Sequence, residues 1–213
     1  GTRSVTRTEP DGSITVLADQ FEGKRLNSPN DVVVHSDGGI WFTDPTYGIL
    51  SDYEGYQAEP EQSGHNVYRI DPQTLDIACV ADDFEQPNGL AFSPDEQTLY
   101  IADSARSHDP DGAHHIRAIQ VIDGCRLGAS RVLAHIEPGI PDGLRIDVQG
   151  NIWTSAGDGI QCFDADGVLL GKIKLPEKVA NLTFGGPRRN RLFIAANTSL
   201  YMIHVSVACA QVP

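Results

Sequence analysis

Short apolar segments alternate with turn-forming residues along the whole chain. Four stretches repeat one order, in which a polar Asn or Asp opens a short apolar segment, a turn such as S-D-G-G or V-Q-G-N follows, and a second apolar segment such as IWFT returns. Two apolar segments around a short turn are typical of a β-hairpin. The predicted hairpins are residues 29–44, 87–103, 141–156 and 180–196.

Further alternating stretches lie between these hairpins, among them HNVYRID, HIRAIQVID, GIQCFD and SLYMIHV. Each repeat therefore supplies about four strands, and helix-length segments with a 3.6-residue period are hard to find. Four strands per repeat, at a spacing of roughly 40 to 58 residues, favour the blades of a β-propeller, where radial packing leaves only short edges exposed. A β-sandwich is the alternative. Either way, the pattern predicts an all-β fold.

Composition limits the domain count and the partners. The chain has 213 residues, 40% of them hydrophobic, so it can bury the core of one large domain. We expect residues 1–213 to form a single propeller domain. The net charge of −13 disfavours nucleic acid, because phosphates would be repelled, and it suits cations. No run of about 18 apolar residues is present, so we expect no membrane span.

The polar residue that opens each hairpin is a candidate for chemistry. In a propeller, the innermost strand of every blade lines the central channel, so the starts of these strands form a ring. Asn30, Asn88, Asp142 and Asn181 are therefore expected to converge on one axis. Amide and carboxylate oxygens are the ligands of hard cations such as Ca²⁺ and Mg²⁺. The alternative is that these side chains only bond the local backbone, as Asn and Asp often do in turns.

Four segments that contain these residues resemble the gluconolactonase and regucalcin-like (SMP-30/gluconolactonase/LRE) family, and more closely its bacterial gluconolactonase branch. They are RLNSPNDVVVHSDGGIWFTDPTYG, QPNGLAFSPDEQTLYIAD, IPDGLRIDVQGNIWTSAGDGI and NLTFGGPRRNRLFIAANTSLY. The resemblance implies a six-bladed propeller with one divalent cation at the channel mouth. It implies that Asn88 and Asp142 are metal ligands, and that Asn30 is a further ligand or holds the substrate. Ca²⁺ is the first expectation for the ion, with Mg²⁺ or Zn²⁺ as alternatives.

The chain departs from the family pattern in two places. The family carries a metal-binding Glu in an E-G-P motif of its first blade, and the nearest match, Glu22-Gly23-Lys24, lacks both the proline and the apolar strand that should follow. We therefore expect an N-terminally incomplete propeller of about four and a half blades. Ser28 stands where the regucalcin branch has a substrate-binding Arg, which weakens the expectation of that branch's lactone specificity.

These features lead to a hypothesis of divalent-metal-dependent hydrolysis of a small-molecule sugar lactone. Asp142 is the expected catalytic residue, which would bind the metal and orient or deprotonate water. The main rival is a non-enzymatic, metal-binding propeller, or an inactive truncated fragment, that serves as a binding scaffold, since fold does not dictate function. A strictosidine-synthase-like activity has less support, and no G-x-S-x-G elbow indicates a serine hydrolase. A cytoplasmic location is expected, with the periplasm as the alternative, and the oligomeric state is left open.

Overall fold

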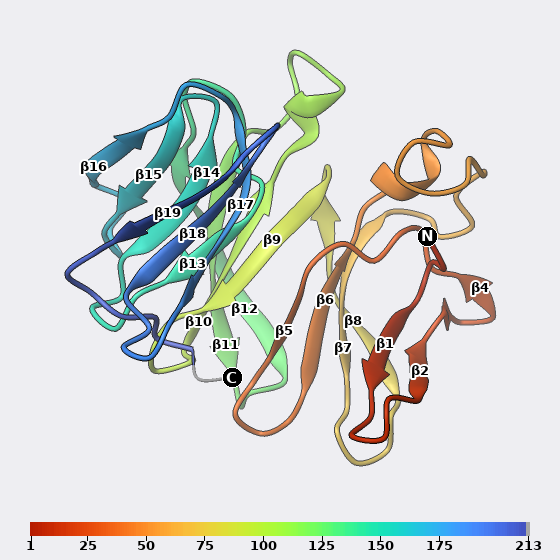
Figure 1. The fold of residues 1–213 in the computed structure, drawn as a ribbon. Helices are drawn as coiled ribbons and strands as arrows, with labels where there is room; N and C mark the ends of the chain where they lie inside the picture. Colours follow the sequence, from red (N-terminus) through yellow and green to blue (C-terminus); the bar gives the residue numbers. More distant parts are fainter. Residues whose placement is uncertain (212–213) are drawn as a thin grey trace. The chain divides into compact units, whose positions relative to one another are not determined.

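The computed structural model describes residues 1–211 and contains two compact units, Gly1–Pro87 and the chain from Asn88 onward. Nearly all of its regular structure is β (Figure 1). The described part has two short 3₁₀ turns, η1 (Tyr47–Ile49) and η2 (Ala105–Ser107). In the same part, no helix has the length and apolarity required to cross a membrane. The prediction of an all-β fold is confirmed.

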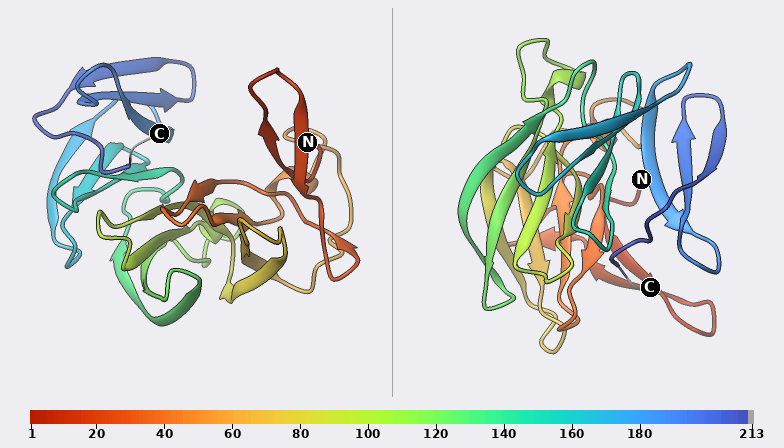
Figure 2. Two further views of the ribbon diagram at one scale, coloured as in Figure 1. Left: turned by 90° about the horizontal axis from the view of Figure 1, so that it is seen from below. Right: turned by 90° about the vertical axis from the view of Figure 1, so that its left-hand side faces the viewer.

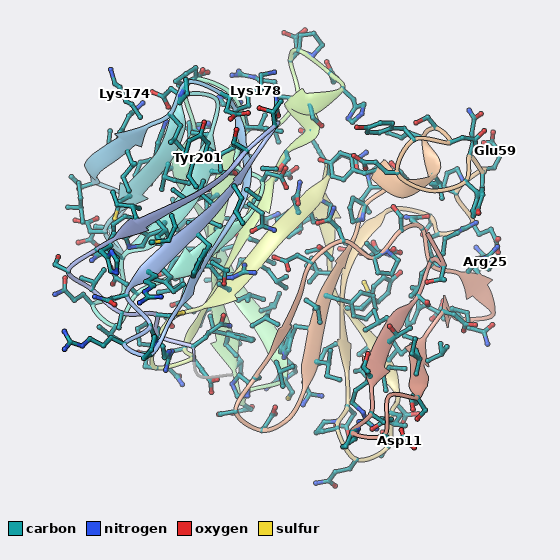
Figure 3. All side chains as sticks on the ribbon, in the orientation of Figure 1. Asp11, Arg25, Glu59, Lys174, Lys178 and Tyr201 are labelled. Carbon is teal, nitrogen blue, oxygen red and sulfur yellow. The ribbon has the colours of Figure 1, made fainter. Side chains whose placement is uncertain are left out.

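The first unit consists of one four-stranded antiparallel sheet and two small hairpins. The hairpins are β1 (Val5–Thr8) with β2 (Ile14–Ala18), and β3 (Gln20–Phe21) with β4 (Lys24–Arg25). The sheet runs in the order β5 (Val32–Val34), β6 (Ile40–Asp44), β7 (His65–Ile70) and β8 (Ile77–Phe84). Figure 3 shows Asp11 at the tip of the β1–β2 hairpin, where its Oδ1 accepts the backbone N–H of Ser13 at 2.9 Å. This Asp is a turn residue, as its Asp-Gly sequence predicts.

The second unit contains two four-stranded sheets and one three-stranded sheet, all antiparallel. The first sheet comprises β9 (Pro87–Phe92), β10 (Thr98–Asp103), β11 (His115–Ile122) and β12 (Arg126–His135). The second comprises β13 (Leu144–Ile146), β14 (Ile152–Ala156), β15 (Gly159–Phe163) and β16 (Leu169–Lys174). The third comprises β17 (Val179–Gly185), β18 (Arg191–Ala196) and β19 (Leu200–His204). Sequential four-stranded meanders of this kind are propeller blades, which confirms the predicted fold class.

The four predicted hairpins all form, each as the first two strands of a sheet. In three of them, an aromatic residue of the second strand pairs with the first strand at the same point: Trp41 with Val33, Trp153 with Arg145, and Phe193 with Thr183. The turn residues between the strands lie where the Gly-rich and Pro-rich sequence predicts them. That residues 1–213 form a single domain of a six-bladed, N-terminally incomplete ring stays a prediction.

Apolar side chains join neighbouring sheets within each unit. In the second unit, one cluster combines Ala91 and Ile116 of the first sheet with Leu144 and Ile152 of the second. Another combines Ile160 with residues of the third sheet, including Leu182 and Ile194. Figure 2 shows these three sheets of the second unit side by side, coloured from yellow-green through cyan to blue. The packing of sheet against sheet fixes where each first strand begins, and those starts carry the candidate site.

Candidate functional site

The backbone around Asp142 is held by three neighbours in the second unit. Its carbonyl oxygen accepts the N–H of Gly89 at 3.0 Å, and its own N–H donates to Oγ of Ser155 at 2.8 Å. The hydroxyl of Ser104 donates to the carbonyl oxygen of Pro141, the residue just before. Ser104 and Ser155 are fully buried, whereas Asp142 keeps part of its surface exposed. Asp142 therefore has a fixed backbone and is partly exposed, as suits a catalytic or metal-binding residue.

Glycine follows both Asn88 and Asp142 because the first strands of neighbouring sheets approach closely here. A Cβ atom at Gly89 would overlap the carbonyl oxygen of Asp142, and a Cβ atom at Gly143 would overlap Oδ1 of Asn181. Any larger residue would force the strands apart. The starts of the strands that carry Asn88 and Asp142 thus lie side by side. Their role as metal ligands stays a prediction.

The structure places Asn181 one residue away from the position predicted for it in the ring. The N–H of Gly143 donates to the carbonyl oxygen of Ala180 at 2.9 Å, just as the N–H of Gly89 donates to that of Asp142. Ala180 is therefore the residue equivalent to Asp142, and Asn181 is equivalent to Gly143. An irregularity in the pairing of β17 with β18, between Val179 and Asn181, accounts for the shift of one residue.

Asn181 and Asp31 both use their side chains locally. Oδ1 of Asn181 accepts the N–H of Leu182 at 2.8 Å, and Oδ1 of Asp31 accepts the N–H of Val32 at 2.9 Å. Each side chain therefore bonds the backbone of the next residue, as short polar residues commonly do. For these two residues, the turn-forming interpretation holds.

Asn30 lies in the first unit, just before β5. Its N–H donates to the carbonyl oxygen of Thr43 at 2.9 Å, and its side chain is exposed. The next residue, Asp31, donates its N–H to Oγ1 of Thr43 at 3.2 Å. Asn30 thus occupies the start of a first strand, the position that Asn88 and Asp142 occupy in the second unit. Its participation in one site with them stays a prediction.

Asp44, at the end of β6, was not singled out from the sequence, yet it organises the loop that precedes Asn30. It is fully buried, and its two carboxylate oxygens accept the N–H groups of Asn27 and Ser28, both at 2.8 Å. Burial raises the pKa of Asp44 to about 7, although both N–H donors and the positive charge of Arg3 act in the opposite direction. A signal was available: an Asp also ends the second strand of the next repeat, at Asp103.

The donor set suits a hard cation. The predicted ligands Asn88, Asp142 and Asn30 offer two amide oxygens and a carboxylate, and no sulfur or imidazole, a set that fits Ca²⁺ or Mg²⁺ better than Zn²⁺. Within residues 1–211, no group of three or more His, Cys, Asp or Glu side chains is arranged to hold a metal ion. Any cation at this site would therefore depend on the amide oxygens of asparagine as well as on Asp142.

Comparisons with known proteins cover almost the whole chain. The family model for the SMP-30/gluconolactonase/LRE-like region matches residues 2–198. The gluconolactonase of Zymomonas mobilis is 34% identical over 216 residues, covering 95% of the chain. A structure of a gluconolactonase from Xanthomonas campestris matches 98% of the chain with a TM-score of 0.87 and 41% identity. An X-ray structure that a structural genomics consortium presented as a gluconolactonase candidate matches 99% of the chain with a TM-score of 0.90 and 38% identity.

The matched proteins are longer than this chain. It spans 58% of the Zymomonas protein, 66% of the Xanthomonas structure and 70% of the structural genomics structure. The family match nevertheless runs through both compact units and includes all three predicted site residues. The chain belongs to the SMP-30/gluconolactonase/LRE-like family.

Proposed function

We propose that the protein hydrolyses a sugar lactone with the help of one divalent cation, Ca²⁺ in the first place and Mg²⁺ or Zn²⁺ as alternatives. The names of the relatives support the reaction class, because those from Zymomonas and Xanthomonas are gluconolactonases. The observation on which the proposal chiefly depends is the hydrogen bond from Gly89 to Asp142, which brings the strand starts of Asn88 and Asp142 together. Asn88 is buried and Asp142 is partly exposed, so a hard cation could bind the amide oxygen and the carboxylate while a small polar substrate approaches from the exposed side.

Lactone hydrolysis requires a water molecule to attack the carbonyl carbon and the ring C–O bond to break, which yields a hydroxy acid. A bound divalent cation would polarise the carbonyl group and stabilise negative charge that develops on its oxygen. The carboxylate of Asp142 orients the attacking water and accepts its proton, which passes to the ring oxygen as the C–O bond breaks. Because Gly89, Ser155 and the Ser104–Pro141 contact hold the backbone of this segment, the carboxylate needs little reorganisation during the reaction.

Asn30 holds the substrate in this proposal, and it is a further candidate ligand of the cation. Its exposed amide can both donate to and accept from sugar hydroxyl groups. Ser28 is a less suitable substrate ligand, because its hydroxyl is occupied by two backbone groups, the carbonyl of Pro45 and the N–H of Gly48. An Arg-dependent recognition of the lactone, as in the regucalcin branch, is therefore not part of the proposal.

The proposal is tested by measuring acid release from a panel of five- and six-carbon sugar lactones at constant pH. The purified chain is treated with EDTA and then supplied with Ca²⁺, Mg²⁺ or Zn²⁺ separately. Asp142→Asn should abolish turnover. The matched control is Asp164→Asn, since Asp164 accepts the N–H groups of Asp166 and Val168 in the β15–β16 turn and has no role in the site. Turnover that ignores EDTA would contradict the metal dependence.

The same experiment separates the enzyme from a binding scaffold. A folded chain that binds Ca²⁺ through Asp142 but hydrolyses none of the lactones would favour the scaffold. Cation binding measured by calorimetry on wild type and Asp142→Asn provides that comparison. The longer relatives contain further sequence, so a matched measurement on a full-length relative shows whether the reaction needs it.

A further inference from the structure

The loop Asn27–Asn30 is held by hydrogen bonds to the end of β6 and to the segment that follows it. Its last residue is the proposed substrate-binding residue Asn30, whose side chain is exposed, whereas Asn27 and Asp44 are fully buried. We propose that Asp44 is a positioning residue, which fixes this loop and thereby orients Asn30 toward substrate without touching the substrate itself. This inference rests on the proposed lactone hydrolysis for its catalytic consequence.

The first set of hydrogen bonds is made by the carboxylate of Asp44. Oδ2 accepts the N–H of Asn27 and Oδ1 accepts the N–H of Ser28, both at 2.8 Å. The two oxygens therefore hold two successive peptide groups, which sets the direction in which the loop leaves β4. Each oxygen satisfies one backbone N–H group in a buried environment, where an unpaired donor would be costly. Asp44 stands 17 residues from Asn27 in the sequence, so this contact is tertiary rather than a local turn.

The second set of hydrogen bonds is made by the hydroxyl of Ser28. It donates to the carbonyl oxygen of Pro45 at 2.6 Å and accepts the N–H of Gly48 at 3.0 Å. Gly48 is packed so tightly that a Cβ atom there would lie 2.8 Å from Cβ of Ser28. Ser28 is thus enclosed by the chain segment that follows Asp44, two residues before Asn30.

The remaining contacts surround the start of the loop. Nδ2 of Asn27 donates to the carbonyl oxygens of Asp44, at 3.3 Å, and Gly64, at 3.0 Å. Nε of the buried Arg3 donates to the carbonyl oxygen of Leu26 at 2.8 Å. Every residue from Leu26 to Ser28 is consequently anchored. Because Pro29 has a restricted backbone, little freedom remains between this anchor and Asn30.

Asp44→Asn is the main test. Asparagine keeps the shape of the side chain but places an NH₂ group against one of the two backbone N–H donors. One of the two hydrogen bonds is therefore replaced by a repulsive contact between donors. We expect the KM for the lactone to rise about tenfold while kcat stays within about threefold, the pattern of lost substrate binding. Amide hydrogen exchange should accelerate at Asn27 and Ser28. Asp71→Asn is the matched control, because Asp71 accepts the N–H groups of Gln73 and Thr74 at the opposite end of the same sheet.

The outcomes separate this inference from the proposed function. Unchanged KM and unchanged exchange at Asn27 and Ser28 in Asp44→Asn would overturn the positioning role. If that variant does not fold, Ser28→Ala decides, since it removes only the two hydrogen bonds of the Ser28 hydroxyl. A raised KM in Ser28→Ala supports the positioning role, and an unchanged KM overturns it. A wild-type chain that shows protected amides but hydrolyses no lactone would overturn the proposed function, while accelerated exchange in Asp44→Asn would still support the fixing of the loop by Asp44.

Discussion

The backbone N–H of Gly89 donates a 3.0 Å hydrogen bond to the carbonyl oxygen of Asp142, although Gly89 lies in β9 and Asp142 lies just before β13 of the next sheet. This bond joins the starts of two neighbouring first strands in the second unit. It exists because Gly89 has no Cβ atom, which would otherwise overlap the same carbonyl oxygen. The position of the proposed catalytic carboxylate therefore depends on a glycine that lies 53 residues earlier in the sequence.

Gly89→Ala should displace the strand start at Asp142 and lower both activity and stability. The added methyl group meets backbone atoms of residues 142–144, which cannot rotate away as a side chain could. We expect kcat/KM to fall by about 100-fold, in line with the effect of small misplacements of catalytic groups. Lactone hydrolysis and calorimetric cation affinity measure the effect. Gly171→Ala is the control, because a Cβ atom there meets nothing within 4 Å. Equal activity of the two variants would contradict the prediction.

Ser155→Ala should weaken the site by releasing the backbone of Asp142. The buried Ser155 hydroxyl accepts the N–H of Asp142 at 2.8 Å, so alanine leaves that donor without this partner. Loss of one partner from a buried hydrogen bond costs about 1 to 3 kcal/mol. We expect kcat to fall about tenfold, with a urea midpoint that is only slightly lower. Ser155→Thr keeps the hydroxyl and should retain more activity. A Ser155→Ala variant with wild-type kcat would show that this bond does not position Asp142.

Local patterns predicted the strands correctly, because alternation and turn chemistry act over a few neighbouring residues. The hairpins formed by β5–β6 and β13–β14 follow directly from VVV-DGG-IWF and LRI-VQGN-IWT. The same patterns placed Asn88 and Asp142 at strand starts. They failed for Asn181, because an irregularity near Val179 changes which residue occupies the equivalent position. A shift of one residue leaves the hydrophobic pattern almost unchanged and is difficult to detect in a single sequence.

The contribution of Asp44 could not be read from local patterns for a different reason. Its partners Asn27 and Ser28 precede it by 17 and 16 residues, and they use backbone N–H groups, which every residue except proline possesses. Nothing in the identity of Asn27 or Ser28 predicts a carboxylate partner. Only the burial of a charged residue at the end of an apolar strand indicates that it must be bonded to something.

Gly48→Ala should displace the loop Asn27–Asn30 by a steric clash alone. A Cβ atom at Gly48 would lie 2.8 Å from Cβ of Ser28, closer than side-chain carbons normally approach, so Ser28 would have to move. Ser28 is two residues from Asn30, and we expect the KM for the lactone to rise about fivefold with kcat nearly unchanged. Steady-state kinetics over a range of lactone concentrations provide the measurement. Gly12 is unsuitable as a control because of its positive φ of 85°, whereas Gly171→Ala is suitable. An unchanged KM would mean that the loop tolerates this displacement.

Asp44 should make the stability of the first unit depend on pH between about 4 and about 7. Its pKa is about 7 in the folded chain, against an ordinary value of 3.8, because burial disfavours the ionised form. In this interval the folded chain retains a proton that the unfolded chain has lost, so stability falls as pH rises and then levels off above about 7. At about 1.4 kcal/mol per pKa unit, the contribution is at most roughly 4 kcal/mol.

The measurement compares urea unfolding of wild type and Asp44→Asn at several pH values from 4 to 8. The chain has two Trp residues, and the fully buried Trp41 lies in the same sheet as Asp44, so a Trp153→Phe background makes fluorescence report on the first unit. Tyr68, a titratable group that interacts with Asp44, stays neutral in this range, since its pKa is raised to about 12. The difference between the two stability curves therefore isolates Asp44. It should slope downward toward pH 7, and a flat difference would show that Asp44 ionises at the same pH in the folded and unfolded chains.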